Sequence, residues 1–184
     1  MIGAAVDLQP EQFFQISDEK QFNETALQVF RYQAGQNEVY NKYLSILNKK
    51  PEDVKSLTEI PFLPIEFFKT EKVITKHKTI NFKPQIFTSS GTTGSEVSRH
   101  FVSEIGIYEK SFQKAFELFY GDVRSYCILA LLPSYLEREG SSLVYMVDDL
   151  IKSSQNQNSG FYLNNLNDLH KTLLLQKENN ENQG

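Results

Sequence analysis

The first third of the chain carries apolar residues at the spacing of helices. From residue 17 onward they recur every three or four positions, which predicts a helix that is capped by Ser17 or Asp18 and stops at Gly35. A second helix is predicted over residues 37–48, where the apolar residues again share one face. These two patterns predict a small helical region at the start of the chain.

Beyond residue 84 the pattern changes to strands that alternate with helices. A short strand is predicted over Gln85–Phe87, and the uniformly apolar "SYCILALLP", residues 125–133, predicts a strand buried on both faces of a parallel sheet. The helices between and after these strands are expected to turn the following side chains inward: Tyr108, Phe112, Ala115, Phe116 and Phe119; Leu143, Met146, Val147 and Leu150; Leu163, Leu166, Leu169 and Leu173. This order predicts an α/β fold in which N-terminal helices precede part of a mainly parallel sheet with flanking helices.

Three segments follow from these changes in pattern. Residues 1–83 hold the helical region and a connector in which two prolines exclude a regular helix, residues 84–176 form the α/β portion, and residues 177–184 are a polar tail. Only two strands are strongly marked, and the last helix leads to a point where a further strand is expected. We therefore expect the chain to be the N-terminal part of a larger fold.

Composition narrows the class of protein. Hydrophobic residues make up 40% of the chain, enough for a packed core, and the net charge of -4 with scattered basic residues argues against a nucleic-acid-binding surface. The single cysteine, Cys127, excludes an internal disulfide, and the three histidines lack metal-ligand spacing. The N-terminus lacks signal-peptide features, and the longest apolar run is too short to span a bilayer. We expect a cytoplasmic protein without membrane insertion.

The stretch "FTSSGTTGSEVSRH", residues 87–100, is the strongest indication of chemistry. Gly91 and Gly94 permit a close approach of the backbone to a ligand, and the surrounding hydroxyls and amides are donors suited to phosphate oxygens. A flexible, solvated linker is the alternative interpretation of the same composition. The Walker motif and the dinucleotide-binding fingerprint are both absent.

Three blocks together resemble a known family. "FTSSGTTGS" is similar to the phosphate-binding loop of the adenylate-forming superfamily, which includes acyl-CoA synthetases. With "IPFLPIEFFKTEKV" before it and "LLPSYLEREGSSLVYMVDDLI" after it, the chain resembles the N-terminal portion of LuxE-type acyl-protein synthetases over almost its whole length.

The resemblance implies ATP-dependent activation of a carboxylic acid, typically a long-chain fatty acid, as an acyl-adenylate whose acyl group then passes to a protein thiol. ATP and Mg²⁺ are the implied cofactors, a fatty acid is the substrate, and an acyl-protein (fatty acid) reductase is the implied partner. The residues implied to hold the ATP phosphates are Thr88, Ser89, Ser90, Gly91, Thr92, Thr93 and Gly94.

The chain departs from the wider superfamily just after this loop. Many acyl-CoA synthetases carry Pro-Lys-Gly there, whereas this chain has Glu-Val-Ser at residues 96–98, and Arg99 is a candidate to replace the lysine. Candidates for an acyl or nucleotide pocket are His100, Tyr135, Glu137 and Arg138. For each candidate a structural role is the alternative: His100 as a packed side chain, and the residues near 137 as a solvated loop.

Two alternatives to a protein-thiol ligase stay open. One is an acyl- or aryl-CoA ligase of the same superfamily, and the other is a non-catalytic nucleotide-binding module. In the resembled family the groups that hold adenine and ribose, a catalytic lysine and the acyl-accepting cysteine lie downstream of these blocks, and Cys127 does not match that cysteine. We therefore expect the chain alone not to complete acyl transfer.

Overall fold

The computed structural model describes residues 10–75, 83–89, 97–134 and 138–181. The chain forms two compact units, Met1–Tyr108 and Glu109–Gly184. Both helices and strands are present, so the predicted mixed α/β class is confirmed. The strands, however, form one antiparallel pair and one parallel pair among the described residues, instead of a mainly parallel sheet.

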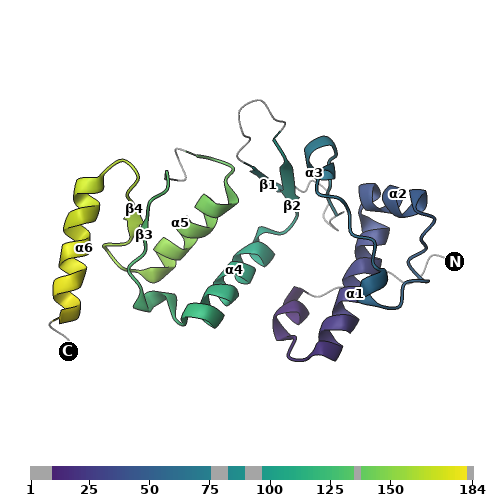
Figure 1. Cartoon of the computed structure of the whole chain (residues 1–184), viewed down its shortest axis with the longest axis horizontal. Coiled ribbons are helices and arrows are strands. Elements are labelled where there is room, and N and C mark those ends of the chain that lie inside the picture. The colour runs from purple at the N-terminus through teal and green to yellow at the C-terminus, as the bar shows by residue number, and fades with distance from the viewer. Residues whose placement is uncertain (1–9, 76–82, 90–96, 135–137, 182–184) are drawn as a thin grey trace. The chain divides into compact units, whose positions relative to one another are not determined.

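The first unit opens with helices that follow one another along the chain (Figure 1), and side-chain caps begin the two longer ones. A 3-10 helix, η1 (Pro10–Gln15), precedes α1 (Glu19–Gln36) and α2 (Glu38–Ile46). The predicted cap Asp18 accepts a hydrogen bond from the Gln21 amide at 2.8 Å. Gly35 does not stop α1, because the helix continues to Gln36 and Asn37 ends it. The Asn37 side chain then accepts from the Tyr40 amide and starts α2.

A cluster of buried side chains holds α1 and α2 together. Its members are Phe30, Ala34, Tyr40, Leu44 and Val54. The Phe30 and Tyr40 rings meet edge to face with centroids 6.1 Å apart, a favoured aromatic geometry. The Tyr40 hydroxyl donates to the carbonyl of Pro61 at 2.8 Å, so the proline-containing connector is tied to the helical core. Two short helices lie along this connector, η2 (Leu57–Glu59) and α3 (Phe67–Thr70).

An antiparallel hairpin completes the described part of the first unit. Strand β1 (Gln85–Thr88) contains the predicted strand, and β2 (Arg99–Val102), which we did not predict, pairs with it. The segment before the hairpin is fixed at Thr75, which bridges to Asn37 and accepts a hydrogen bond from the Ser103 hydroxyl. The sequence "RHFV" of β2 has too little strand character to be recognised without its partner.

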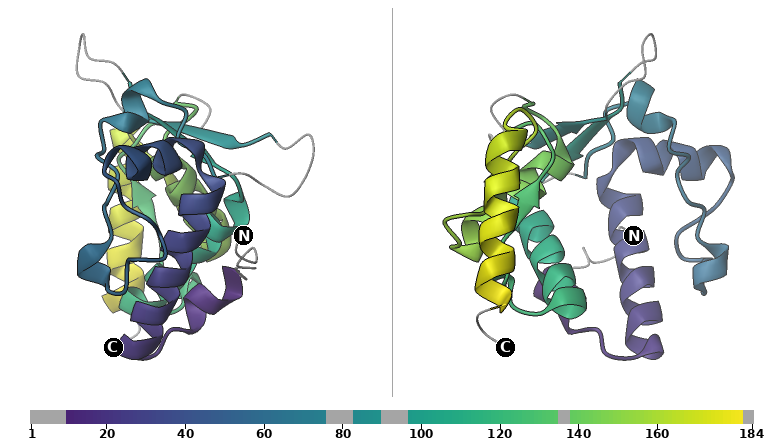
Figure 2. Two further views of the ribbon diagram at one scale, coloured as in Figure 1. Left: turned by 90° about the vertical axis from the view of Figure 1, so that its right-hand side faces the viewer. Right: turned by 60° about the vertical axis from the view of Figure 1, so that its left-hand side comes forward.

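The second unit is built mainly from helices. Helix α4 (Ile105–Tyr120) runs into it from the first unit, and 3-10 helix η3 (Val123–Ser125), strand β3 (Leu129–Ala130), α5 (Ser142–Ser154), β4 (Gly160–Phe161) and α6 (Leu166–Glu181) follow. Figure 1 and the right panel of Figure 2 show α5 beside the second-unit part of α4. Gln113 of α4 donates to the Asp149 carboxylate of α5 at 2.9 Å.

The strand predicted over residues 125–133 is shorter and more exposed than expected. Only Leu129 and Ala130 have strand geometry, and they pair in parallel with Gly160 and Phe161. Ala130 is buried, but Leu131 is 57% exposed. The prediction of burial on both faces was wrong at Leu131, because among the described residues β3 pairs with β4 alone.

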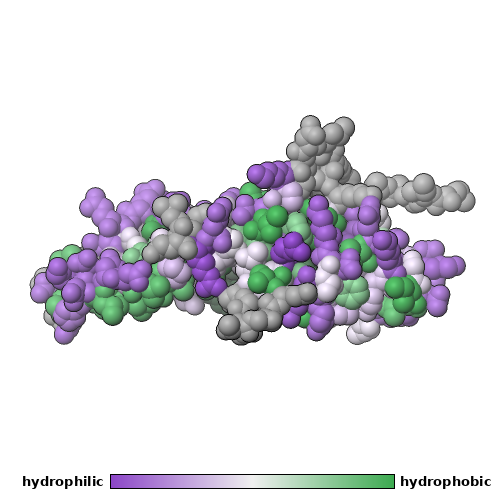
Figure 3. All heavy atoms as spheres, turned by 90° about the horizontal axis from the view of Figure 1, so that it is seen from above, coloured by the Kyte–Doolittle hydropathy of each residue, from purple (hydrophilic) through white to green (hydrophobic). Residues whose placement is uncertain are grey.

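Helix α5 forms where the sequence predicts it, whereas α6 begins at Leu166, after the predicted Leu163, and runs to Glu181. The burial of both helices differs from the prediction. Ser141 caps α5, in which Val144 is buried, whereas Leu143, expected to point inward, is half exposed. Helix α6 buries no residue whose exposure the structure describes. Figure 3 shows hydrophobic surface among polar side chains on the second unit, to which the exposed leucines of α6 belong. No helix among the described residues has the length and apolar character needed to cross a membrane.

Candidate functional site

Two hydrogen bonds between Ser89 and Ser98 close the base of the hydroxyl-glycine loop (residues 88–94). We call this base the neck. The Ser89 amide donates to the Ser98 carbonyl at 3.1 Å, and the Ser98 amide donates to the Ser89 hydroxyl at 3.2 Å. Ser98 is 9% exposed, whereas Thr88 and Ser89 are exposed. The candidate residues Ser90–Gly94 lie outside the described residues. The described part of the candidate loop is therefore a hydrogen-bonded base in which Thr88 and Ser89 are exposed residues.

One face of the hairpin is aromatic and packed. In the antiparallel register Phe87 lies opposite His100, so both side chains point to the same face. Phe87 is 4% exposed and contacts the Tyr108 ring at a centroid distance of 5.3 Å. The His100 ring is half-buried and stacks on Phe68 of α3, with centroids 4.6 Å apart. These contacts are those of a packed histidine, the structural alternative for this candidate.

The opposite face of the hairpin is exposed and carries positive charge. The exposed residues Thr88 and Arg99 lie opposite each other at the end nearest the loop, followed by Ile86 opposite Phe101. The Lys72 ammonium lies over the Phe101 ring, 5.6 Å from its centroid. Arg99, the candidate to replace the lysine, is thus exposed and next in sequence to Ser98, which bonds Ser89. Sequence reasoning missed Lys72, because nothing local links it to residue 101.

The remaining pocket candidates are only partly described. Arg138 is exposed in the second unit, where its amide donates to the Ser134 carbonyl at 3.1 Å. Tyr135 and Glu137 lie outside the described residues. His100 and Arg138 therefore belong to different units.

Cys127 lies in a setting that does not activate a thiol. Burial raises the pKa of Cys127, and a hydrogen bond with Ser159 offsets part of this rise. A thiol with a raised pKa stays protonated near neutral pH, whereas the nucleophile in acyl transfer is the thiolate. This agrees with the expectation that Cys127 is not an acyl acceptor.

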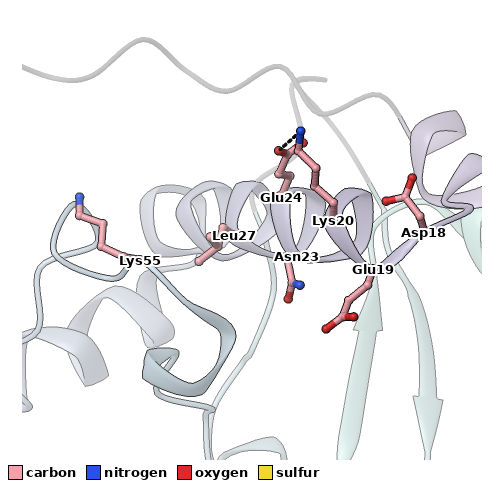
Figure 4. A pocket seen from close by; sticks show the side chains of 7 residues that line it. All are labelled: Asp18, Glu19, Lys20, Asn23, Glu24, Leu27 and Lys55. Atoms are coloured by element: carbon pink, nitrogen blue, oxygen red, sulfur yellow. Dashed lines mark ion pairs between the residues drawn. The ribbon is translucent and has the colours of Figure 1, made fainter.

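A separate open hollow runs along α1, shown in Figure 4. It has a volume of about 800 Å³ and is lined by Asp18, Glu19, Lys20, Asn23, Glu24, Leu27 and Lys55. Three carboxylates face two ammonium groups there, and Lys20 already pairs with Glu24. The resulting negative balance disfavours a polyphosphate, and none of the predicted site residues lines the hollow.

The described residues contain no group of three or more His, Cys, Asp or Glu side chains arranged to hold a metal ion. No family model, no curated protein and no solved structure matches the chain. The three sequence blocks and the geometry of the hairpin are therefore the features of the chain that bear on its function.

Proposed function

We propose that the chain carries the phosphate-binding part of an ATP-dependent, AMP-forming acid–thiol ligase of the acyl-protein synthetase type. It would activate a carboxylic acid, the long-chain fatty acid that the resemblance implies, as an acyl-adenylate for transfer to a protein thiol. The N-terminal portion of the adenylate-forming fold, a cytoplasmic location and an acyl-protein reductase as partner belong to the same proposal.

The neck of the hairpin is the observation that carries this proposal. Ordering a loop rich in glycine and serine costs conformational entropy, and the cost falls when the two ends of the loop are already held together. The bonds between Ser89 and Ser98 hold these ends. A solvated linker between two domains would not need such a closure, whereas a loop that wraps around an anion gains from it.

The proposed role of the loop is to stabilise negative charge on the phosphates of ATP. When the carboxylate attacks the α-phosphorus of ATP, the bond to the leaving pyrophosphate breaks and negative charge builds on that group. Donors already aimed at the β- and γ-phosphates stabilise this charge, and they align the α-phosphorus with the incoming oxygen. Bound Mg²⁺ would share the charge on the phosphates. The hydroxyls of Thr88 and Ser89 and the amides beyond them are the proposed donors.

Binding of ATP·Mg²⁺ tests the proposal directly. A ligand at about a hundred times its Kd stabilises a protein by about 2.7 kcal/mol, so a rise in the thermal midpoint is expected when ATP·Mg²⁺ is added. Replacing both loop threonines with valine, Thr92→Val and Thr93→Val, removes two hydroxyls at nearly constant volume and should reduce that rise. Thr70→Val at an exposed position of α3 is the matched control. An unchanged midpoint for the unmodified chain at millimolar ATP·Mg²⁺ would refute nucleotide binding.

Catalysis is tested separately from binding. We expect the chain with ATP, myristate and labelled pyrophosphate to show no robust exchange, because the blocks that hold adenine and ribose in the resembled family are absent from it. Robust exchange would show that the chain is a complete adenylating enzyme. If exchange occurs, offering a protein thiol and CoA side by side separates a protein ligase from a CoA ligase. ATP binding without exchange leaves the non-catalytic module as the competing interpretation.

A further inference from the structure

We draw no further inference here: the strongest candidate, the exposed leucine surface of α6 formed by Leu166, Leu173, Leu174 and Leu175, carries none, because nothing in the structure shows what covers it.

Discussion

Helices α1 and α6 illustrate how differently the two units use apolar residues. They have similar lengths, 18 and 16 residues, but α1 buries Phe30 and Ala34, while four leucines of α6 are 45–61% exposed. Helix α1 packs against α2 and the connector, which together cover Phe30 and Ala34. The comparison shows that a helical pattern specifies a helix, whereas burial requires a partner surface.

In the second unit, the hydroxyls of two serines hold the turn that follows α5. Ser154, at the end of α5, is 2% exposed and donates to the Ile151 carbonyl at 2.7 Å. Its hydroxyl also bonds that of Ser159, which accepts from the Ile128 amide beside β3. This short network holds the turn after α5 against the parallel pair β3–β4. The first unit thus has a cluster of buried apolar side chains between its helices, whereas the turn after α5 in the second unit is held by a pair of hydroxyls.

The largest loss of stability is expected from a substitution in the core of the first unit. Leu44 is 2% exposed, so Leu44→Ala removes well-packed methyl groups and should reduce the free energy of unfolding by about 2–5 kcal/mol. Leu173→Ala on α6, at 50% exposure, is the matched control and should change it by less than about 0.5 kcal/mol. Urea unfolding followed by circular dichroism measures both. Equal losses would mean that α6 is covered by a partner in solution.

An intermediate loss of stability is expected when the hydrogen bond between Ser154 and Ser159 is removed. Ser154→Ala removes a buried donor and leaves the Ser159 hydroxyl without that contact, so the free energy of unfolding should fall by about 1–3 kcal/mol. The neighbouring Ser153→Ala is the control, because its hydrogen bond to Asp149 is long, at 3.5 Å, and its side chain is less buried. Hydrogen exchange of the Ile128 and Gly160 amides reports where the loss occurs. Similar effects for the two serines would contradict a special role for this hydrogen bond.

The smallest effect is expected from the hydroxyl that ties the connector to the helical core. Tyr40→Phe removes the bond to Pro61 and should cost about 1 kcal/mol at neutral pH. Tyr43→Phe is the control, since its hydroxyl makes no hydrogen bond to a described residue.

The same tyrosine should give a pH dependence in the alkaline range. Burial, with a smaller contribution from Tyr43, raises the pKa of Tyr40 from 10.0 to about 12 in the folded chain. The unfolded chain therefore loses the proton first, so the stabilising contribution is complete below pH 10 and falls as the pH rises toward 12. The difference in stability between the unmodified chain and Tyr40→Phe should narrow over that range. A constant difference would contradict the raised pKa.

The sequence by itself determined that the long helices form, though not their exact ends, together with the cap at Asp18 and the strand at Gln85, because these depend on local periodicity and on hydrogen bonds within a few residues. It also singled out the hydroxyl-glycine loop.

Only the tertiary structure decided which contacts hold the base of that loop and the hairpin that carries it. The pairing of Ser89 with Ser98, the stacking of His100 on Phe68 and the approach of Lys72 to Phe101 join residues that are 9 to 32 positions apart. Such contacts depend on strand register and on the path of the connector, which no local pattern encodes. For the same reason the sequence predicted a buried strand at Leu131, although burial is set by the neighbours that the fold supplies.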